Sequence, residues 1–170
     1  MAFIQTLARL DKTLHNTKTF HCGKPSMDQF LTRFAAKHAE LGLSSTWVLL
    51  EDVQVEKLPI AAYYTLAAAN VSKTSLPTHQ SLPQYPIPVV LLARLAIDQQ
   101  HQGKGLGAKI LISALRHAVQ LTDQGLPAFG LMLDILDEQA LSFYQHFDFF
   151  EPMTDDPMRL FASMNSLRNI

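Results

Sequence analysis

The residues with the clearest chemical meaning are three glycines placed directly before an expected helix. Gly103, Gly105 and Gly107 follow an apolar stretch that reads as a strand, and an amphipathic helix is expected over 105–121. Glycines let a ligand approach the main chain, and the first amides of a helix have no internal partner and carry the positive end of its dipole. This arrangement predicts a site for a phosphate or pyrophosphate. The alternative is a glycine-rich turn that binds nothing.

The spacing of these glycines excludes two common nucleotide-binding loops. A Rossmann turn has the pattern G-x-G-x-x-G with an acidic residue about 20 positions later, and a Walker loop ends in G-K-S/T. Here the pattern is G-x-G-x-G, and Lys104 is followed by Gly105. Neither of these two loops therefore fits the spacing of this turn.

The other reactive side chains show no strong catalytic pattern. Cys22 is the one cysteine, so an internal disulfide is impossible, and no motif supports it as a nucleophile. His101 lies beside the glycines and is expected to be a solvated turn residue rather than a general base. Arg94 interrupts an apolar strand and therefore needs a partner, either a carboxylate or an anionic substrate. We find no metal-binding motif and no strong general base.

Hydrophobic periodicity predicts the elements that position these residues. A helix is expected over 26–41, capped by Ser26 or Asp28 and ended by Gly42. Strands over 46–50 and 60–69 suggest an antiparallel hairpin, and a polar connection leads to a central strand over 87–97. The helix over 105–121 is followed by a strand over 129–133, a helix over 138–147 and last strands near 149 and over 158–162. This order predicts an α/β (α+β) fold, with a mixed central sheet flanked by helices in a single domain over 1–170.

Composition narrows the class of protein. Hydrophobic residues make up 48% of the chain and charged residues 17%, which excludes an intrinsically disordered chain. The net charge of −1 shows no overall basic excess of the kind expected for a nucleic-acid-binding protein. No signal peptide and no apolar run of about 18–20 residues is apparent, so we expect a cytoplasmic protein with no membrane contact.

Motifs across nearly the whole chain resemble the GNAT superfamily of acyl-CoA N-acyltransferases. Gln102, Gly105 and Gly107 fit its Q/R-x-x-G-x-G/A motif. The chain is most similar to the toxin acetyltransferases of the TacT and AtaT kind, through FHCG at 20–23, MDQFL at 27–31, AYYTL at 62–66 and LARLAI at 92–97. It departs from the usual pattern at Ala93, Lys104 and Asp148, where Gly, Arg and Gly are typical.

The resemblance implies a GNAT fold and an acetyl-CoA-dependent N-acetyltransferase that needs no metal. Tyr144 stands at the family's position for the general acid that protonates the leaving thiolate. The alternative is an aromatic residue with a solvated hydroxyl. Main-chain groups of the strand would pair with pantetheine, and amides of the turn would hold the pyrophosphate. The implied acetyl-CoA-binding residues are Leu95, Ala96, Ile97, Gln102, Gly103, Lys104, Gly105, Leu106 and Gly107.

The resemblance further implies a homodimeric type II toxin that acetylates the amino group of aminoacyl-tRNA and is neutralised by a ribbon-helix-helix antitoxin. Such a substrate needs basic residues to contact phosphates. Residues 1–50 carry six Lys or Arg against three Asp or Glu, whereas residues 51–170 carry eight against twelve. Arg33 and Lys37, four residues apart on the first helix, are candidates for this contact, unless they are only a solvated helix face. Arg94 is a further candidate substrate residue.

Two other functions stay open. Residues 134–156 hold seven carboxylates and no Lys or Arg, a pattern that favours a cationic partner such as a basic antitoxin tail or a polyamine-like amine. The alternative is therefore an N-acetyltransferase of a small-molecule or protein amine without toxin activity. A degenerate fold that only binds CoA or a partner protein is opposed by the intact glycine turn and by Tyr144.

Overall fold

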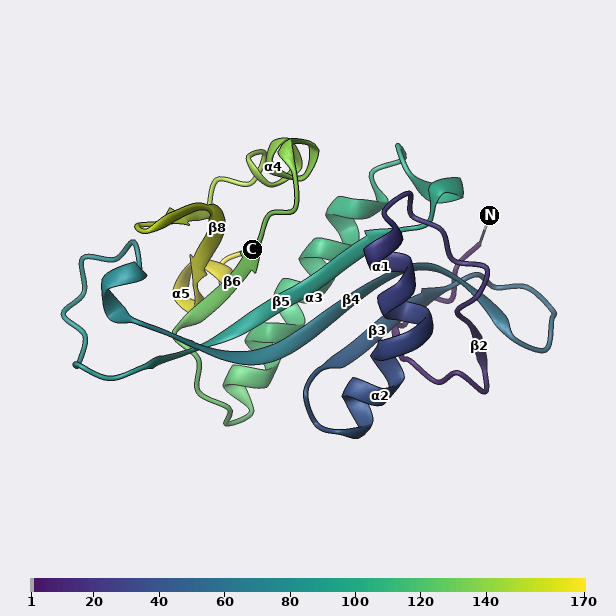
Figure 1. Ribbon diagram of the computed structural model, residues 1–170, viewed down its shortest axis with the longest axis horizontal. Helices are drawn as coiled ribbons and strands as arrows, with labels where there is room; N and C mark the ends of the chain where they lie inside the picture. Colours follow the sequence, from purple (N-terminus) through teal and green to yellow (C-terminus); the bar gives the residue numbers. More distant parts are fainter. Residues whose placement is uncertain (1) are drawn as a thin grey trace. The chain divides into compact units, whose positions relative to one another are not determined.

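The computed structural model describes residues 2–170, which divide into two compact units. Unit 1 contains the residues up to Ala67 together with Arg94–Ser113, and unit 2 contains Ala68–Ala93 and Ala114–Ile170. The chain passes between the units along the strands β4 and β5 and along the helix α3. The elements of each unit are labelled in Figure 1 where there is room.

Unit 1 is built on an antiparallel sheet. The strand β3 pairs with both β1 and β4, β2 runs parallel to β4, and β5 neighbours β4. The antiparallel β3–β4 pairing confirms the predicted hairpin. The elements of this unit are β1 (Ala8–Arg9), β2 (His15–Asn16), α1 (Pro25–Gln29), the π-helical turn η1 (Phe30–Phe34), α2 (Ala35–Glu40), β3 (Ser45–Leu50), most of β4 (Leu58–Val71), the end of β5 (Ile87–Ile97), the 3-10 turn η3 (Gln99–His101) and the start of α3 (Leu106–Asp123).

The helical layer of unit 1 lies across the β3–β4 hairpin (Figure 1). The buried hydroxyl of Tyr63 on β4 donates a hydrogen bond to the main-chain oxygen of Met27 on α1 at 2.7 Å. Around this contact the core gathers apolar side chains from the N-terminal segment, the helices and the strands. They include Phe20, Met27, Phe30, Leu31, Ala35, Val48, Leu50, Ile60, Tyr63 and Ala96.

The first helix differs from the prediction in two ways. It begins at Pro25, and the cap position is Lys24, whose side chain does not cap the helix, so neither Ser26 nor Asp28 is the cap. Asp28 instead accepts a hydrogen bond from the Cys22 amide at 2.9 Å. The helix is also not continuous, because the amide of Ala35 bonds to the oxygen of Phe30, five residues back. Such a π-helical turn is a bulge of one turn inside an α-helix.

Unit 2 mixes parallel and antiparallel strands. The start of β5 runs parallel to β6, while β8 runs antiparallel to both β6 and β7. This arrangement confirms the predicted mixed sheet with flanking helices, whereas the single domain over 1–170 stays a prediction. Unit 2 holds the end of β4, the 3-10 turn η2 (Lys73–Ser75), the start of β5, the rest of α3, β6 (Gly130–Asp134), α4 (Glu138–Tyr144), β7 (Glu151–Met153), β8 (Asp156–Ser163) and α5 (Met164–Leu167).

Unit 2 has its own apolar core. It is formed by side chains from the β4–β5 connection and from the strands around β8, namely Val71, Leu76, Ile87, Val89, Met132, Met153 and Phe161. Strand β6 lies so close to β8 that a Cβ at Gly130 would clash with the main-chain oxygen of Ala162. Glycine is therefore required at this point of the β6–β8 pairing for a steric reason, not for a ligand.

Candidate functional site

The glycine turn of unit 1 has the conformation that the sequence predicts. Gly103 and Gly105 have φ angles of +77° and +80°, a region that other residues enter only with strain. A Cβ built at either residue would meet no atom within 4 Å, so this side of the turn is open. Helix α3 begins at Leu106, directly after the turn, and the first amides of a helix lack internal partners. The turn therefore fits a phosphate group that approaches the main chain.

Two side chains hold the turn in place from its N-terminal side. Asp98 caps η3 by accepting from the amide of Gln100 at 3.0 Å, and its second oxygen accepts from the amide of His21 at 3.0 Å. The side-chain amide of Gln102 donates to the main-chain oxygens of Cys22 and Ile97, both at 2.8 Å. The side chain of Gln102 thus clamps the turn, and its main-chain amide donates to the main-chain oxygen of Gln99 at 3.4 Å.

His101 is buried, so the expectation of a solvated turn residue is wrong. Its side chain is 5% exposed, and its Nε2 lies 2.7 Å from Oε1 of Glu51. The ring of Phe3 packs edge-on against the imidazole at 5.1 Å. Both partners lie far away in the sequence, and a buried polar ring needs such a partner because leaving it unpaired is costly. This pairing takes His101 out of the set of candidate general bases.

The end of β5 contains the predicted pantetheine residues. Ala96 is buried in the core of unit 1, whereas Leu95 and Ile97 on either side of it are half-buried, as expected for alternating strand residues. The last pair between β5 and β6 is Leu92 with Leu133, and β5 runs on to Ile97. Residues 93–97 therefore extend beyond the β5–β6 pairing, as the resemblance implies for a strand whose main chain pairs with pantetheine.

Arg94 makes a contact that neither expectation included. Its guanidinium lies 4.3 Å from the centre of the Phe30 ring, and its Nη1 is 3.7 Å from the sulfur of Met27. A cation over an aromatic face is worth about 0.5–1 kcal/mol, and it leaves the charge unneutralised. Arg94 thus presents a positive charge beside α1 and η1.

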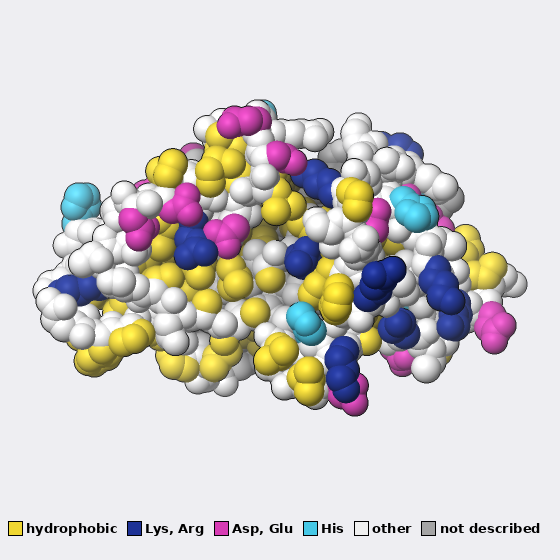
Figure 2. All heavy atoms as spheres, viewed as in Figure 1, with side chains coloured by type: hydrophobic (Ala, Val, Ile, Leu, Met, Phe, Trp, Pro, Cys, Tyr) yellow, Lys and Arg dark blue, Asp and Glu magenta, His cyan; other side chains and the backbone are white. Residues whose placement is uncertain are grey.

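A group of exposed basic residues lies on the same helical layer. Lys12 donates from its ammonium to the main-chain oxygen of Thr32 at 3.0 Å, next to Arg33 on η1. The hydroxyl of Thr32 donates to the main-chain oxygen of Thr17 at 3.4 Å, which brings Lys18 to the same region. We define the basic surface as Lys12, Lys18, Arg33 and Lys37, all exposed. Figure 2 shows Lys and Arg side chains gathered over this part of unit 1.

The sequence identified only half of this surface. Arg33 and Lys37 were predicted because they share one helix face, whereas Lys12 and Lys18 join them only through the hydrogen bonds of Thr32. Lys37 is also 3.7 Å from Glu40, an exposed pair of little energetic value. Glu40 therefore neutralises part of the charge of Lys37.

Tyr144 ends α4 in unit 2 and is buried, with 8% of its surface exposed. Phe143 and Phe150 pack edge-on against its ring at 5.0 and 5.8 Å. Burial raises the pKa of its phenol to about 12, so the hydroxyl keeps its proton at neutral pH. Tyr144 lines a pocket of about 390 Å³ with Leu141, Gln145, Phe147, Asp148, Phe150, Pro152, Pro157, Met158 and Leu160.

The environment of Cys22 opposes nucleophilic catalysis. Burial is the main cause that raises the pKa of its thiol to about 11. Because the thiolate is the reactive form, this thiol is a weak nucleophile at neutral pH. The structure thus agrees with the lack of a motif around Cys22.

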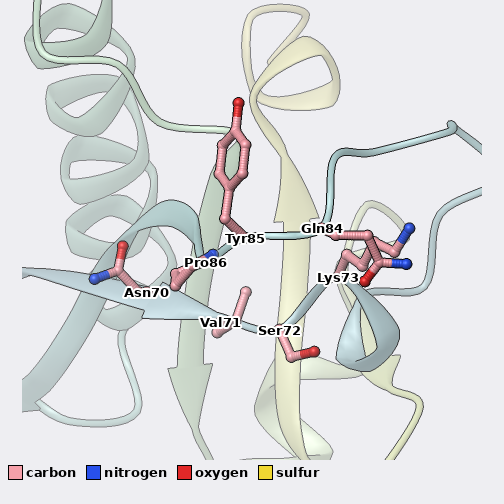
Figure 3. Close-up of a pocket in the computed structure, with 7 residues that line it drawn as sticks. All are labelled: Asn70, Val71, Ser72, Lys73, Gln84, Tyr85 and Pro86. Carbon is pink, nitrogen blue, oxygen red and sulfur yellow. The ribbon is translucent and has the colours of Figure 1, made fainter.

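A second pocket of unit 2 lies at the connection between β4 and β5. It has a volume of about 380 Å³, and Figure 3 shows Asn70 on one side and Lys73 with Gln84 on the other, while the ring of Tyr85 projects away. The ammonium of Lys73 donates to the main-chain oxygen of Leu82 at 3.0 Å, so it braces the connection itself. None of the predicted site residues lines this pocket.

The described part of the chain, residues 2–170, offers neither a metal site nor a membrane-spanning helix. No group of three or more His, Cys, Asp or Glu side chains in this part of the chain is arranged to hold a metal ion. No helix there is both long and apolar enough to cross a membrane.

Known proteins with similar sequences and structures include acetyltransferase toxins. A relative from Mycobacterium tuberculosis (strain ATCC 25618 / H37Rv), the tRNA-acetylating toxin, is 35% identical over 88% of this chain and 87% of its own. A structure of AtaT complexed with acetyl-methionyl-tRNAfMet has a TM-score of 0.85 at 25% identity, covering 96% of this chain and 97% of that one. A structure of AtaTR bound with AcCoA has a TM-score of 0.82 at 26% identity, covering 96% of each chain.

The family itself is shown by a match over most of the chain. Residues 43–151 match the acetyltransferase (GNAT) domain, a range that contains β3, β4, β5, the glycine turn, α3 and Tyr144. Together with the 35% identical relative, this match covers the elements that carry every motif of the predicted acetyl-CoA site. The chain therefore belongs to the GNAT acetyltransferase family.

Proposed function

We propose that this protein transfers the acetyl group of acetyl-CoA to the amino group of an aminoacyl-tRNA and thereby acts as a toxin on translation. The observation that carries the proposal is the 35% identity to a tRNA-acetylating toxin over 88% of the chain. The open glycine turn and the basic surface in unit 1 support it on physical grounds, because the donor carries a pyrophosphate and the acceptor many phosphates.

In this proposal the glycine turn and the end of β5 bind the donor. Main-chain amides at Gly103, Gly105 and Gly107 hold the pyrophosphate, and those of Leu95 and Ile97 pair with pantetheine. Gln102, Lys104 and Leu106 belong to the same cradle, in which the side chain of Gln102 clamps the turn, and Ala96 fixes the strand through the core. A main-chain amide of the strand also polarises the thioester carbonyl, where negative charge develops during attack.

The chemical step needs one proton donor and one neutral amine. The amine nitrogen attacks the thioester carbon, the C–S bond breaks, and the phenol of Tyr144 gives its proton to the departing thiolate. The pKa of Tyr144 is raised to about 12, so the donor form predominates at neutral pH. The proton lost by the amine passes to solvent, and Tyr144 is then reprotonated, so the reaction ends with an amide and free CoA.

The basic surface supports an RNA acceptor despite the net charge of −1. Phosphate binding depends on local clusters of Lys and Arg, because exposed charges are screened over about 10 Å at ordinary salt. Lys12, Lys18, Arg33 and Lys37 form such a cluster, and Arg94 on β5 adds a positive charge beside the ring of Phe30. We assign the first four to the tRNA backbone and Arg94 to the acceptor end.

Further parts of the proposal rest on the resemblance to toxin acetyltransferases. They are a homodimer, a cytoplasmic location and a ribbon-helix-helix antitoxin as partner. Light scattering of the purified chain measures the oligomeric state. A neighbouring gene for a short ribbon-helix-helix protein, together with co-purification of the two products, tests the antitoxin.

A second candidate function is acetylation of a small cationic amine or of a protein amine. The observation that favours it is the acidic stretch over 134–156, although Asp134 is already paired with Arg159 at 2.6 Å. A competition assay separates the two acceptors. With limiting acetyl-CoA, the chain is given aminoacyl-tRNA, spermidine and a lysine-containing peptide together, and each product is quantified. The proposal expects acetyl-aminoacyl-tRNA to dominate, and it fails if the free amines take the label instead.

A further inference from the structure

The pair formed by His101 and Glu51 ties the glycine turn to a distant part of unit 1. Asp98 and Gln102 hold the turn to the main chain at 21–22, which lies in the N-terminal segment. His101, immediately before Gln102, holds it to Glu51, which directly follows β3. The turn is therefore fixed from two directions, and the His101–Glu51 bond is the anchor to the sheet.

Stability alone does not account for this pair. The side chains of His101 and Glu51 are 5% and 11% exposed, so both have lost most of their hydration. Replacing such a buried pair by apolar residues of similar volume is often neutral or stabilising. A hydrogen bond has a preferred length and direction, whereas apolar packing has neither, so the bond fixes the position of the groups that it joins. The pair is thus suited to setting the position of the residues that follow His101.

We propose that His101 and Glu51 are positioning residues for the pyrophosphate site, and that their hydrogen bond sets the affinity of the glycine turn for acetyl-CoA. This inference rests on the proposed function, since it takes the turn as the site of the pyrophosphate. Neither side chain touches the ligand in this account. The pair acts through the main chain from Gln102 to Gly105.

Two donors that differ in the pyrophosphate test the inference. Acetyl-CoA carries it, whereas acetyl-pantetheine lacks both the pyrophosphate and the nucleotide. In Glu51→Leu and His101→Phe we expect the Kd for CoA and the KM for acetyl-CoA to rise about tenfold, which corresponds to about 1.4 kcal/mol. The kcat at saturating acetyl-CoA and the kcat/KM for acetyl-pantetheine stay unchanged, because neither depends on binding at the turn.

Control variants separate positioning from stability. Glu51→Gln keeps an oxygen that accepts from Nε2, so its CoA affinity should approach that of the unaltered protein. Thr65→Val removes a buried 2.7 Å hydrogen bond to Thr46 at the β3–β4 contact, and it should leave the Kd for CoA unchanged. The double variant with His101→Phe and Glu51→Leu should recover thermal stability through apolar packing but should not recover CoA affinity.

The outcomes are distinguishable. If both single variants keep the Kd for CoA, or if acetyl-CoA and acetyl-pantetheine lose activity equally, the inference is wrong. If the unaltered protein binds no CoA, the proposed function fails as well. His101→Phe keeps a ring against Phe3, so it provides the same comparison if Glu51→Leu does not fold.

Discussion

Replacing Gly105 with alanine should weaken CoA binding by an amount that can be worked out from the backbone. Gly105 has a φ of +80°, and a Cβ there would meet no protein atom within 4 Å. The substitution therefore causes no clash within the protein, and its cost is the left-handed conformation itself, about 1–2 kcal/mol for a residue with a Cβ. If the turn relaxes to relieve this strain, CoA binding must restore it, which lowers the affinity by about 5- to 30-fold.

Gly42 provides a matched control. It ends α2 with a φ of +78°, and a Cβ there also meets nothing within 4 Å. Gly42→Ala should therefore lose about 1–2 kcal/mol of stability, whereas in Gly105→Ala the same strain is divided between stability and CoA affinity. For a chain of this size each kcal/mol lowers Tm by about 2–4 °C. Only Gly105→Ala should change the Kd for CoA.

The assay combines a thermal melt with calorimetric titration of CoA. A Tm loss in Gly42→Ala without a CoA effect, together with a smaller Tm loss and weaker CoA binding in Gly105→Ala, would support the assignment of the turn. If Gly105→Ala binds CoA as well as the unaltered protein does, or if Gly42→Ala weakens binding equally, the argument from the glycine conformation is wrong.

Three further predictions concern other residues. Tyr144→Phe should lower kcat by about 100-fold or more while Tm stays close to that of the unaltered protein, because only the proton donor is removed; a normal kcat would show that the hydroxyl has no acid role. Arg33→Ala should raise the KM for aminoacyl-tRNA and reduce the magnitude of its salt dependence by about one phosphate contact, whereas Arg168→Ala, which removes an exposed pair with Asp123, should do neither. Cys22→Ala should keep full acetyl transfer, and alkylation of the Cys22 thiol should accelerate with rising pH towards its pKa of about 11; loss of activity without loss of fold would point to a covalent acetyl-enzyme.

Local features of the chain were largely predictable. The strand over 87–97 was expected with the bounds that the structure has, because an apolar run preceded by proline is a local signal. The same holds for the glycine turn, since Gly103 and Gly105 lie directly between a strand and a helix. The end of the first helix at Gly42 was likewise encoded by one residue with a positive φ.

Features that depend on distant contacts were not predictable. His101 was expected to be solvated because its partner, Glu51, is 50 positions away, and no residue near His101 in the sequence indicates this contact. The π-helical turn at 30–34 depends on one shifted hydrogen bond, which a helical hydrophobic pattern does not report. The ring of Phe30 under Arg94 was also not expected, because an arginine on a strand gives no sign of which helix it faces.

The proposed reaction leaves a chemical mark that can be measured directly. The purified chain is incubated with acetyl-CoA and a mixture of aminoacyl-tRNAs, the RNA is digested, and the terminal aminoacyl-adenosines are analysed by mass spectrometry. We predict aminoacyl-adenosine carrying one acetyl group on its amino nitrogen with the unaltered protein, and almost none with Tyr144→Phe. Unmodified aminoacyl-adenosine throughout, from a protein that binds CoA and acetylates free amines, would contradict the proposed acceptor.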